Sequence, residues 1–252
     1  MKELICFISC VNDKHLYDKC LQHIKELNIP EGYGIDIIAI YDAESLTSGY
    51  NRAMAKSNAK YKVYLHQDTF IINKNFIHDI MNIFTKHPEI GMLGMAGAKN
   101  IPVSGEWGRS KKRKGKVIEG KADGRRVLFT FGEIYEDYEP VICIDGLLMV
   151  TQYDILWRQD IFDGWDFYDV SQCMEFMRAN YQVCIPKQKE SWCIHDCGDL
   201  NMKNFDKYRR AFLKEYAKDL FLLGNLFPTI YNWNKKIRPY QKKIEMLVKD
   251  LF

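Results

Sequence analysis

The chain has 252 residues, of which 47% are hydrophobic and 27% are charged, proportions typical of a folded globular protein rather than a disordered or fibrous one. A net charge of +3 is too small to indicate nucleic-acid binding, so we expect no nucleic-acid partner. The first residues lack the long apolar core of a secretory signal, so we expect a cytoplasmic protein whose eight cysteines stay reduced.

The first hundred residues alternate strand-like and helix-like segments. Short apolar runs predict strands at 4–10, 35–41, 61–65 and 90–97. Apolar residues at helical spacing predict helices at 16–27, 45–57 and 75–87, the second with Thr47 or Ser48 as its N-cap. This order predicts a Rossmann-like α/β fold with a mostly parallel central sheet flanked by helices.

The regular alternation stops at residues 98–140, which predict a loop with an extra pair of strands and a role in shaping a substrate cleft. Residues 140–155 predict a strand, a turn and a second apolar segment. A helix is expected within 164–182, a strand at 183–186 and helices in the remainder of the chain. The apolar stretch at 220–227 is shorter than the roughly 20 residues of a membrane-spanning helix.

Basic residues cluster at 109–116, 124–126 and 234–243. Such runs are usually solvated surface segments. The alternative hypothesis is that 109–116 and 234–243 face an anionic acceptor or the inner face of a membrane, giving a cytoplasmic protein with peripheral membrane contact.

The common phosphate-binding and hydrolase motifs are absent. The sequence has no G-x-G-x-x-G after its first strand, no G-x-x-x-x-G-K-[ST] and no G-x-S-x-G, which argues against dinucleotide enzymes, P-loop kinases and nucleophile-elbow hydrolases. Acidic and histidine residues instead follow the predicted strands: Asp42, His66, Asp68, Asp145, Asp166, Asp169 and His195. Sparse carboxylates and imidazoles suit Mg²⁺ or Mn²⁺ held mainly by a ligand's phosphates.

Five motifs in order resemble those of GT-A-fold glycosyltransferases of family 2 type, in the bacterial glycosyltransferase-like branch. They are IYDAESLTSGYNRAM, YKVYLHQD, IDGLLMVTQYDI, FDGWDFYDVSQCMEF and IHDCG, within about residues 4–215. The resemblance implies a GT-A domain at 1–215, with a nucleotide-binding half at 1–100 and an acceptor half at 101–215. Residues 216–252 would then form a helical C-terminal extension.

The resemblance also implies a metal site. Asp68 matches the last carboxylate of the family's D-x-D motif, and His195 matches the late histidine that completes the metal site in many members. The first Asp of the motif is His66 here, so His66 and the adjacent Gln67 are expected to contact the nucleotide. A structural zinc site of His195 with Cys193 and Cys197 is the alternative.

Donor contacts are implied at further positions. Asp42 matches the acidic residue that hydrogen-bonds the base or ribose, while Asn51 and Arg52 match the segment lining the nucleotide pocket. The alternative for Arg52 is a surface helix cation. Asp145 and Gly146 look like a turn that meets the donor sugar, and a purely structural turn would give the same pattern.

Asp169 matches the family's catalytic base, and the alternative is that it caps a helix. The neighbouring acceptor-binding residues are expected to be Trp165, Asp166, Phe167 and Tyr168, because aromatic faces are typical sugar platforms.

These residues together predict a hexosyltransferase that uses Mn²⁺ or Mg²⁺. It would move a sugar from a nucleotide-diphosphate sugar, with a UDP-sugar favoured, to a hydroxyl of a glycan, lipid-linked or protein acceptor, inverting the anomeric centre. The alternatives are a nucleotidyltransferase or metal-dependent phosphotransferase, and a non-catalytic binding protein that keeps the fold.

Overall fold

The computed structural model describes residues 3–121, 123–198 and 202–236. The chain divides into two compact units, Met1–Glu215 and Tyr216–Phe252, and the first contains every strand. The long helix α5 (Phe205–Lys236) begins in the first unit and continues into the second. The basic run at 234–243 lies mostly outside the described residues.

A seven-stranded sheet forms the centre of the first unit, in the order β2-β1-β3-β11-β5-β12-β9. Its strands are β1 (Glu3–Cys10), β2 (Tyr33–Ile40), β3 (Tyr61–Leu65), β5 (Ile90–Gly94), β9 (Tyr138–Val141), β11 (Leu148–Thr151) and β12 (Gln182–Pro186). The pairs β1–β2, β1–β3 and β5–β12 are parallel, whereas β11 runs antiparallel to both β3 and β5. The α/β class is confirmed, but the sheet is mixed, because β11 returns between two parallel strands.

A smaller sheet has the order β10-β6-β7-β13-β4, and β8 pairs with β7. Its strands are β4 (Thr69–Ile71), β6 (Ala96–Ala98), β7 (Arg113–Gly120), β8 (Arg126–Thr130), β10 (Cys143–Ile144) and β13 (Cys193–His195). The strand expected at 90–97 is therefore two strands, β5 and β6, in different sheets. The basic run at 109–116 is only partly a loop, since β7 begins at Arg113.

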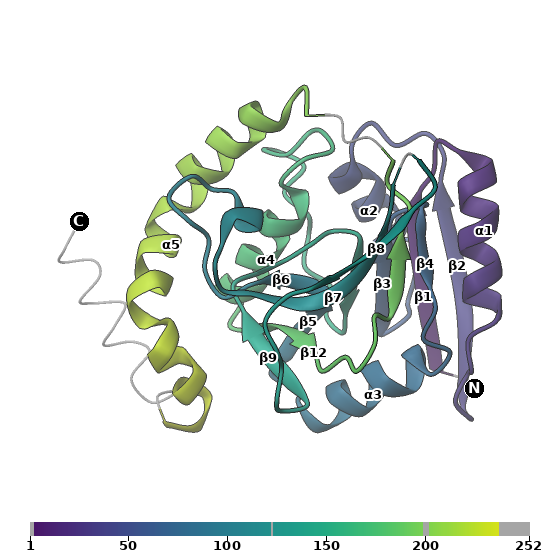
Figure 1. Ribbon diagram of the computed structural model, residues 1–252, viewed down its shortest axis with the longest axis horizontal. Helices are drawn as coiled ribbons and strands as arrows, with labels where there is room; N and C mark the ends of the chain where they lie inside the picture. The colour runs from purple at the N-terminus through teal and green to yellow at the C-terminus, as the bar shows by residue number, and fades with distance from the viewer. Residues whose placement is uncertain (1–2, 122, 199–201, 237–252) are drawn as a thin grey trace. The chain divides into compact units, whose positions relative to one another are not determined.

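Four helices cover the central sheet: α1 (Lys14–Lys25), α2 (Leu46–Met54), α3 (Phe76–Lys86) and α4 (Tyr168–Arg178). Figure 1 shows α1 running beside β1 and β2. Apolar residues of α1 and α3 form one core with Ile5, Phe7 and Val63 of the sheet. Successive side chains of a strand point to opposite faces of the sheet. Tyr64, next to Val63, therefore faces the other side, where its ring packs on Tyr50 of α2.

Helix starts differ from the sequence predictions. The N-cap of α2 is Ser45, whose hydroxyl accepts from the Ser48 amide, so neither Thr47 nor Ser48 caps it. Ser48 instead fills the third helical position and completes a reciprocal capping box with Ser45. The first helix begins at Lys14, two residues before the predicted start, because the Asp13 carboxylate caps it by accepting from the backbone amides of His15 and Leu16.

Candidate active site

The strand ends of both sheets bring two histidines and an aspartate together. His66 and Asp68 follow β3, and the His66 amide donates to the Leu147 carbonyl (3.1 Å) just before β11. His195 ends β13, whose pairing with β4 places it opposite Thr69. The Asp196 amide also donates to the Asp68 carbonyl (2.8 Å). These backbone bonds fix segments about 130 residues apart at one sheet edge, where ligands of α/β folds bind.

The three side chains could hold a metal ion. His195 Nε2 lies 3.5 Å and His66 Nδ1 lies 4.0 Å from Asp68 Oδ1, and the two imidazole nitrogens are 3.3 Å apart. All three ligand atoms fall within 4.8 Å of one another. Asp68 Oδ1 is buried without a hydrogen-bond partner, an arrangement that a cation would satisfy. The donor set of one carboxylate and two imidazoles fits Mn²⁺.

Charge interactions shape this cluster. Burial alone would raise the pKa of the Asp68 carboxyl, but the neighbouring imidazoles of His195 and His66 hold it below its usual value. Burial would lower the pKa of His195, yet the Asp68 carboxylate raises it. Burial and the charge of His195 lower the pKa of His66. Asp68 is therefore ionised and His66 neutral near pH 7, the forms in which both bind metals.

Tyr168 holds the outer nitrogen of His66. The Tyr168 hydroxyl lies 2.5 Å from His66 Nε2, and Tyr168 is buried. When His66 Nε2–H donates to the tyrosine oxygen, the lone pair on Nδ1 faces the cluster, as metal binding requires. A side chain at Gly146 would block this contact, because an added Cβ would lie 2.0 Å from the Tyr168 hydroxyl.

Asp169 lies beside the cluster in the first turn of α4. Its Oδ2 accepts from the Gly146 amide (3.0 Å). Burial and the nearby charge of Asp145 raise the pKa of the Asp169 carboxyl to about 7. Phe167 is the N-cap of α4, so Asp169 is not the cap. A half-buried carboxyl with a pKa near neutrality suits proton transfer at physiological pH.

A pocket of about 280 Å³ adjoins the cluster on the side of β1 and β2. It is lined by Cys10, Val11, Asn12, Tyr41, Ala43, Leu46, His66, Gln67, Asp68 and Trp165. The side-chain oxygen Oε1 of Gln67 accepts from the backbone amides of Asn12 and Asp13, each at 2.8 Å, so it ties the loop after β1 to the end of β3. Gln67 thus shapes this pocket as well as lining it.

A second pocket, of about 400 Å³, lies on the other side of His66. The predicted residues that line it are His66, Asp145, Trp165, Asp166, Phe167, Tyr168, Asp169 and His195. Burial raises the pKa of the Asp166 carboxyl. Phe167 has a φ of 62°, unusual for a bulky residue, and its ring packs against Phe205 (5.0 Å) and Phe212 (5.5 Å) of α5. This packing holds the strained turn that presents Asp166 and Asp169.

Four residues expected at the donor site line neither pocket: Asp42, Asn51, Arg52 and Gly146, the last of which donates its backbone amide to Asp169. The Asp42 carboxylate pairs with the Arg52 guanidinium (2.9 Å) on the surface, although its neighbours Tyr41 and Ala43 line the smaller pocket. The Asn51 side chain bonds to the segment before α4: its Nδ2 donates to the Trp157 backbone carbonyl (3.0 Å), and its Oδ1 accepts from the Trp157 backbone amide (2.9 Å). Its position supports a structural role.

The alternative zinc site does not form. Cys193 is buried in the core, and the metal-ligating group found among the described residues contains neither Cys193 nor Cys197. His195 faces Asp68 and His66 instead.

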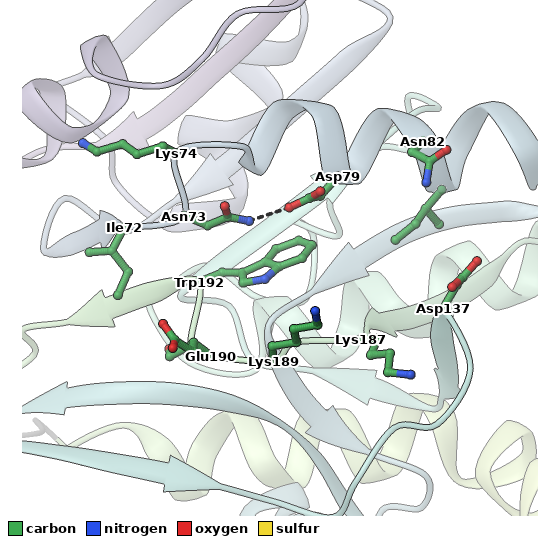
Figure 2. Close-up of a pocket in the computed structure, with 12 residues that line it drawn as sticks. Ile72, Asn73, Lys74, Asp79, Asn82, Asp137, Lys187, Lys189, Glu190 and Trp192 are labelled. Carbon is green, nitrogen blue, oxygen red and sulfur yellow. Dashed lines mark hydrogen bonds between the residues drawn. The ribbon is translucent and has the colours of Figure 1, made fainter.

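A larger hollow lies elsewhere. Figure 2 shows this hollow of about 600 Å³ between α3 and residues 187–192. The Ile72 amide donates to the Trp192 carbonyl at its edge, and Thr69 and His195 pair at the opposite end of β4. Lysines and carboxylates line it in equal number: Lys74, Lys187, Lys189, Asp79, Asp137 and Glu190. None of the cluster residues lines it, so its size does not make it the active site.

Sequence reasoning missed parts of both pockets. Cys10 ends the first strand and Val11 and Asn12 follow it, and their position at the strand's carboxyl end was a signal that could have found them. Glu106, Trp107 and Arg109 belong to the irregular 98–140 segment, where no periodicity indicates which side chains face a cleft.

Solved structures similar to this chain are glycosyltransferases with the same fold, GT-A. The chain resembles S. aureus TarS 1–349 in complex with UDP, with a TM-score of 0.52, 11% identity and coverage of 85% of this chain and 65% of that one. It also resembles the mannosyltransferase PcManGT from Pyrobaculum calidifontis in complex with GDP-Man and Mn²⁺ (TM-score 0.52, 10% identity, 86% and 64% coverage). The chain thus spans less than two thirds of each.

The family of the chain follows from a comparison of its sequence with a family model. Residues 6–216 match the model of the glycosyltransferase-like family, and the chain belongs to this family. A comparison with curated proteins gives no match. Within the described residues, no helix is both long and apolar enough to cross a membrane.

Proposed function

We propose that this protein is a metal-dependent hexosyltransferase that moves a sugar from a nucleotide-diphosphate sugar to an acceptor hydroxyl. The observation that carries the proposal is the unpartnered, buried Asp68 Oδ1 between two imidazoles, beside two adjoining pockets and a carboxyl with a pKa of about 7. Residues 1–100 would supply most of the nucleotide site and 101–215 most of the acceptor site.

The smaller pocket suits the nucleoside. Tyr41 and Trp165 offer aromatic surface, and the exposed end of β1 offers Asn12. We favour UDP as the nucleotide. Asp42 and Arg52 lie next to this pocket and would reach a base or ribose only by exchanging their mutual ion pair for the ligand.

Asp68, His195 and His66 would hold Mn²⁺ or Mg²⁺ against the donor diphosphate. The bound ion would neutralise the negative charge that develops on the leaving diphosphate. Asp145 and Gly146 would border the donor sugar, with the Gly146 amide also orienting Asp169.

Asp169 would accept the proton of the acceptor hydroxyl as its oxygen attacks the anomeric carbon. A single displacement of this kind inverts the anomeric centre. The Gly146 amide directs Asp169 Oδ2, and Phe167, two residues earlier, packs against Phe205 of α5.

The test is a calorimetric titration of UDP with Mn²⁺ and with a chelator. We expect binding that depends on Mn²⁺ and falls at least tenfold in Asp68→Ala, because that variant removes the carboxylate of the cluster. Asp18→Ala, a change on the exposed face of α1, is the matched control and should bind as the wild type does. Equal UDP affinity with and without Mn²⁺, in both variants, would refute the assignment.

Turnover separates the remaining alternatives. Release of UDP from a nucleotide sugar, with the sugar on a new hydroxyl, distinguishes this activity from nucleotidyl transfer, which would release the sugar 1-phosphate from the same donor. Metal-dependent nucleotide binding with no turnover would identify a non-catalytic binding protein.

A further inference from the structure

The far wall of the larger pocket comes from the 98–140 segment. Gly105, Glu106, Trp107, Gly108 and Arg109 line it opposite the α4 turn. Hydrogen bonds hold both ends of this segment in place, so it is an ordered part of the pocket wall. The Arg209 guanidinium donates to the Ser104 carbonyl (2.9 Å), and the Ser110 hydroxyl donates to Asn100 Oδ1 (2.7 Å).

Two tryptophans contribute aromatic surface to the pocket. Trp165 is 50% exposed, and Trp107 is half-buried in the short 3₁₀ turn Trp107–Arg109. Aromatic faces bury apolar C–H surface, while nearby carboxylates accept hydrogen bonds from hydroxyl groups. A pyranose ring offers both an apolar face and a rim of hydroxyls.

Carboxyl groups outnumber the basic groups of the lining, which are the Arg109 guanidinium and the imidazoles of His66 and His195. Four carboxyl groups line this pocket: Glu106, Asp145, Asp166 and Asp169. Among the described residues that line it, Arg109 is the one Lys or Arg. The Arg109 guanidinium pairs with the Glu106 carboxylate (2.7 Å), so its charge is already offset. A phosphate or carboxylate on the bound ring would meet like charges, which is a strong means of rejecting wrong ligands.

We propose that this pocket binds the neutral pyranoside of a glycan acceptor, with Trp107 as a contact for the ring and Glu106 as the residue that keeps Arg109 from recruiting anionic acceptors. This inference rests on the proposed function for its biological meaning, but its binding prediction can be tested separately. The proposed function leaves open whether the acceptor is a glycan, a lipid-linked molecule or a protein. This inference specifies that the acceptor carries a neutral sugar at the position that reacts.

The experiment is a ligand-observed NMR titration of the full chain with Mn²⁺ and UDP. The probes are neutral sugars (cellobiose, lactose, maltose and chitobiose) and two anionic ones, glucuronic acid and glucose 6-phosphate. We expect saturable binding of at least one neutral sugar and at least tenfold weaker binding of both anionic probes. Trp107→Ala should weaken neutral-sugar binding at least tenfold. Tyr135→Ala, an exposed aromatic outside the pocket, is the control and should not change it.

Glu106→Gln provides a second, independent variant. Removal of its charge leaves the Arg109 guanidinium without its carboxylate partner, so the affinity ratio of anionic to neutral probe should rise several-fold. Stronger binding of anionic probes by the wild type, or neutral-sugar binding unaffected by Trp107→Ala, would overturn the inference.

UDP binding is measured on the same samples, and it separates the two proposals. If UDP binds with Mn²⁺ and no neutral sugar binds, the acceptor inference fails and the donor assignment stands. If neutral sugars bind as expected without any nucleotide binding, the acceptor pocket stands and the glycosyltransfer proposal fails.

Discussion

Replacement of Asp169 by Asn tests the division of roles in the site most directly. Asn retains an oxygen that can accept from the Gly146 amide, the bond that Asp169 Oδ2 makes at 3.0 Å, so the turn should keep its conformation. It cannot take a proton. Loss of a general base typically costs about 10²–10⁴-fold in rate, and we expect this loss in sugar transfer with UDP affinity within about twofold of the wild type.

The same substitution should raise stability at alkaline pH. The pKa of the Asp169 carboxyl is about 7 in the folded protein and 3.8 in its reference state, so the folded state binds this proton more tightly. The resulting stability is fully present below pH 4 and is lost as the pH rises through 7. The difference corresponds to at most about 4 kcal/mol, and partial solvent contact reduces it. Asp169→Asn should remove this loss.

The assays are the transfer rate from pH 5 to 9 and thermal unfolding of the metal-free protein at pH 4 and 8. The wild-type transfer rate should rise with pH and level off above about 7, as Asp169 loses its proton. The transfer rate of the variant should not show this rise. Asp169→Asn should unfold at a higher temperature than the wild type at pH 8 and at nearly the same temperature at pH 4. Asp18→Asn, on an exposed face, controls for the chemical change. A near-normal transfer rate in Asp169→Asn would refute its role as base and make Asp166 the candidate.

Two further predictions concern the turn before β11 and the basic run. Gly146→Ala places a Cβ 2.0 Å from the buried Tyr168 hydroxyl, so we expect the unfolding free energy, measured in urea, to fall by about 1–3 kcal/mol. Gly108→Ala is the control: a Cβ there has nothing within 4 Å and should change the unfolding free energy by less than about 0.5 kcal/mol. Equal stability of the two variants would show that the turn relaxes freely. In the 109–116 run, Lys111 and Lys112 are exposed, whereas the other basic side chains contact neighbouring groups. Only two lysines of this run are then available to anionic lipid, so co-sedimentation of the protein with anionic vesicles should be weak and sensitive to salt. The double variant Lys111→Gln, Lys112→Gln should reduce it further. Binding that persists in that double variant would assign it to another surface.

The helices and strands of the first hundred residues were predictable because local patterns determine them. Apolar residues alternate or recur at helical spacing in the predicted elements, and the type of each was correct, but the short strand β4 (Thr69–Ile71) was not predicted. Strand direction was not predictable, since an apolar segment such as Leu148–Thr151 reads alike in either orientation. The division of 90–97 between two sheets was also invisible, because every residue there is buried.

Residues of the candidate site were predicted where they match recognisable motifs. Asp68, His195 and Asp169 were predicted this way, and the structure brings them to adjoining pockets. Asn51 also matched a motif, yet its side chain holds the Trp157 segment, because a motif does not show which way a helix face turns.

The sequence by itself determined which chemical groups are available and which strand ends carry them, since period and turn signals are local properties. Only the tertiary structure decided their use. Backbone bonds of β3 to β11 and of β4 to β13 bring His66 within 3.3 Å of His195 across 129 positions of sequence. Packing of the 98–140 segment places Trp107 and Glu106 opposite Asp169, and burial then raises the pKa of that carboxyl to about 7. Distance, burial and local charge arise from contacts between remote segments, and no local pattern records them.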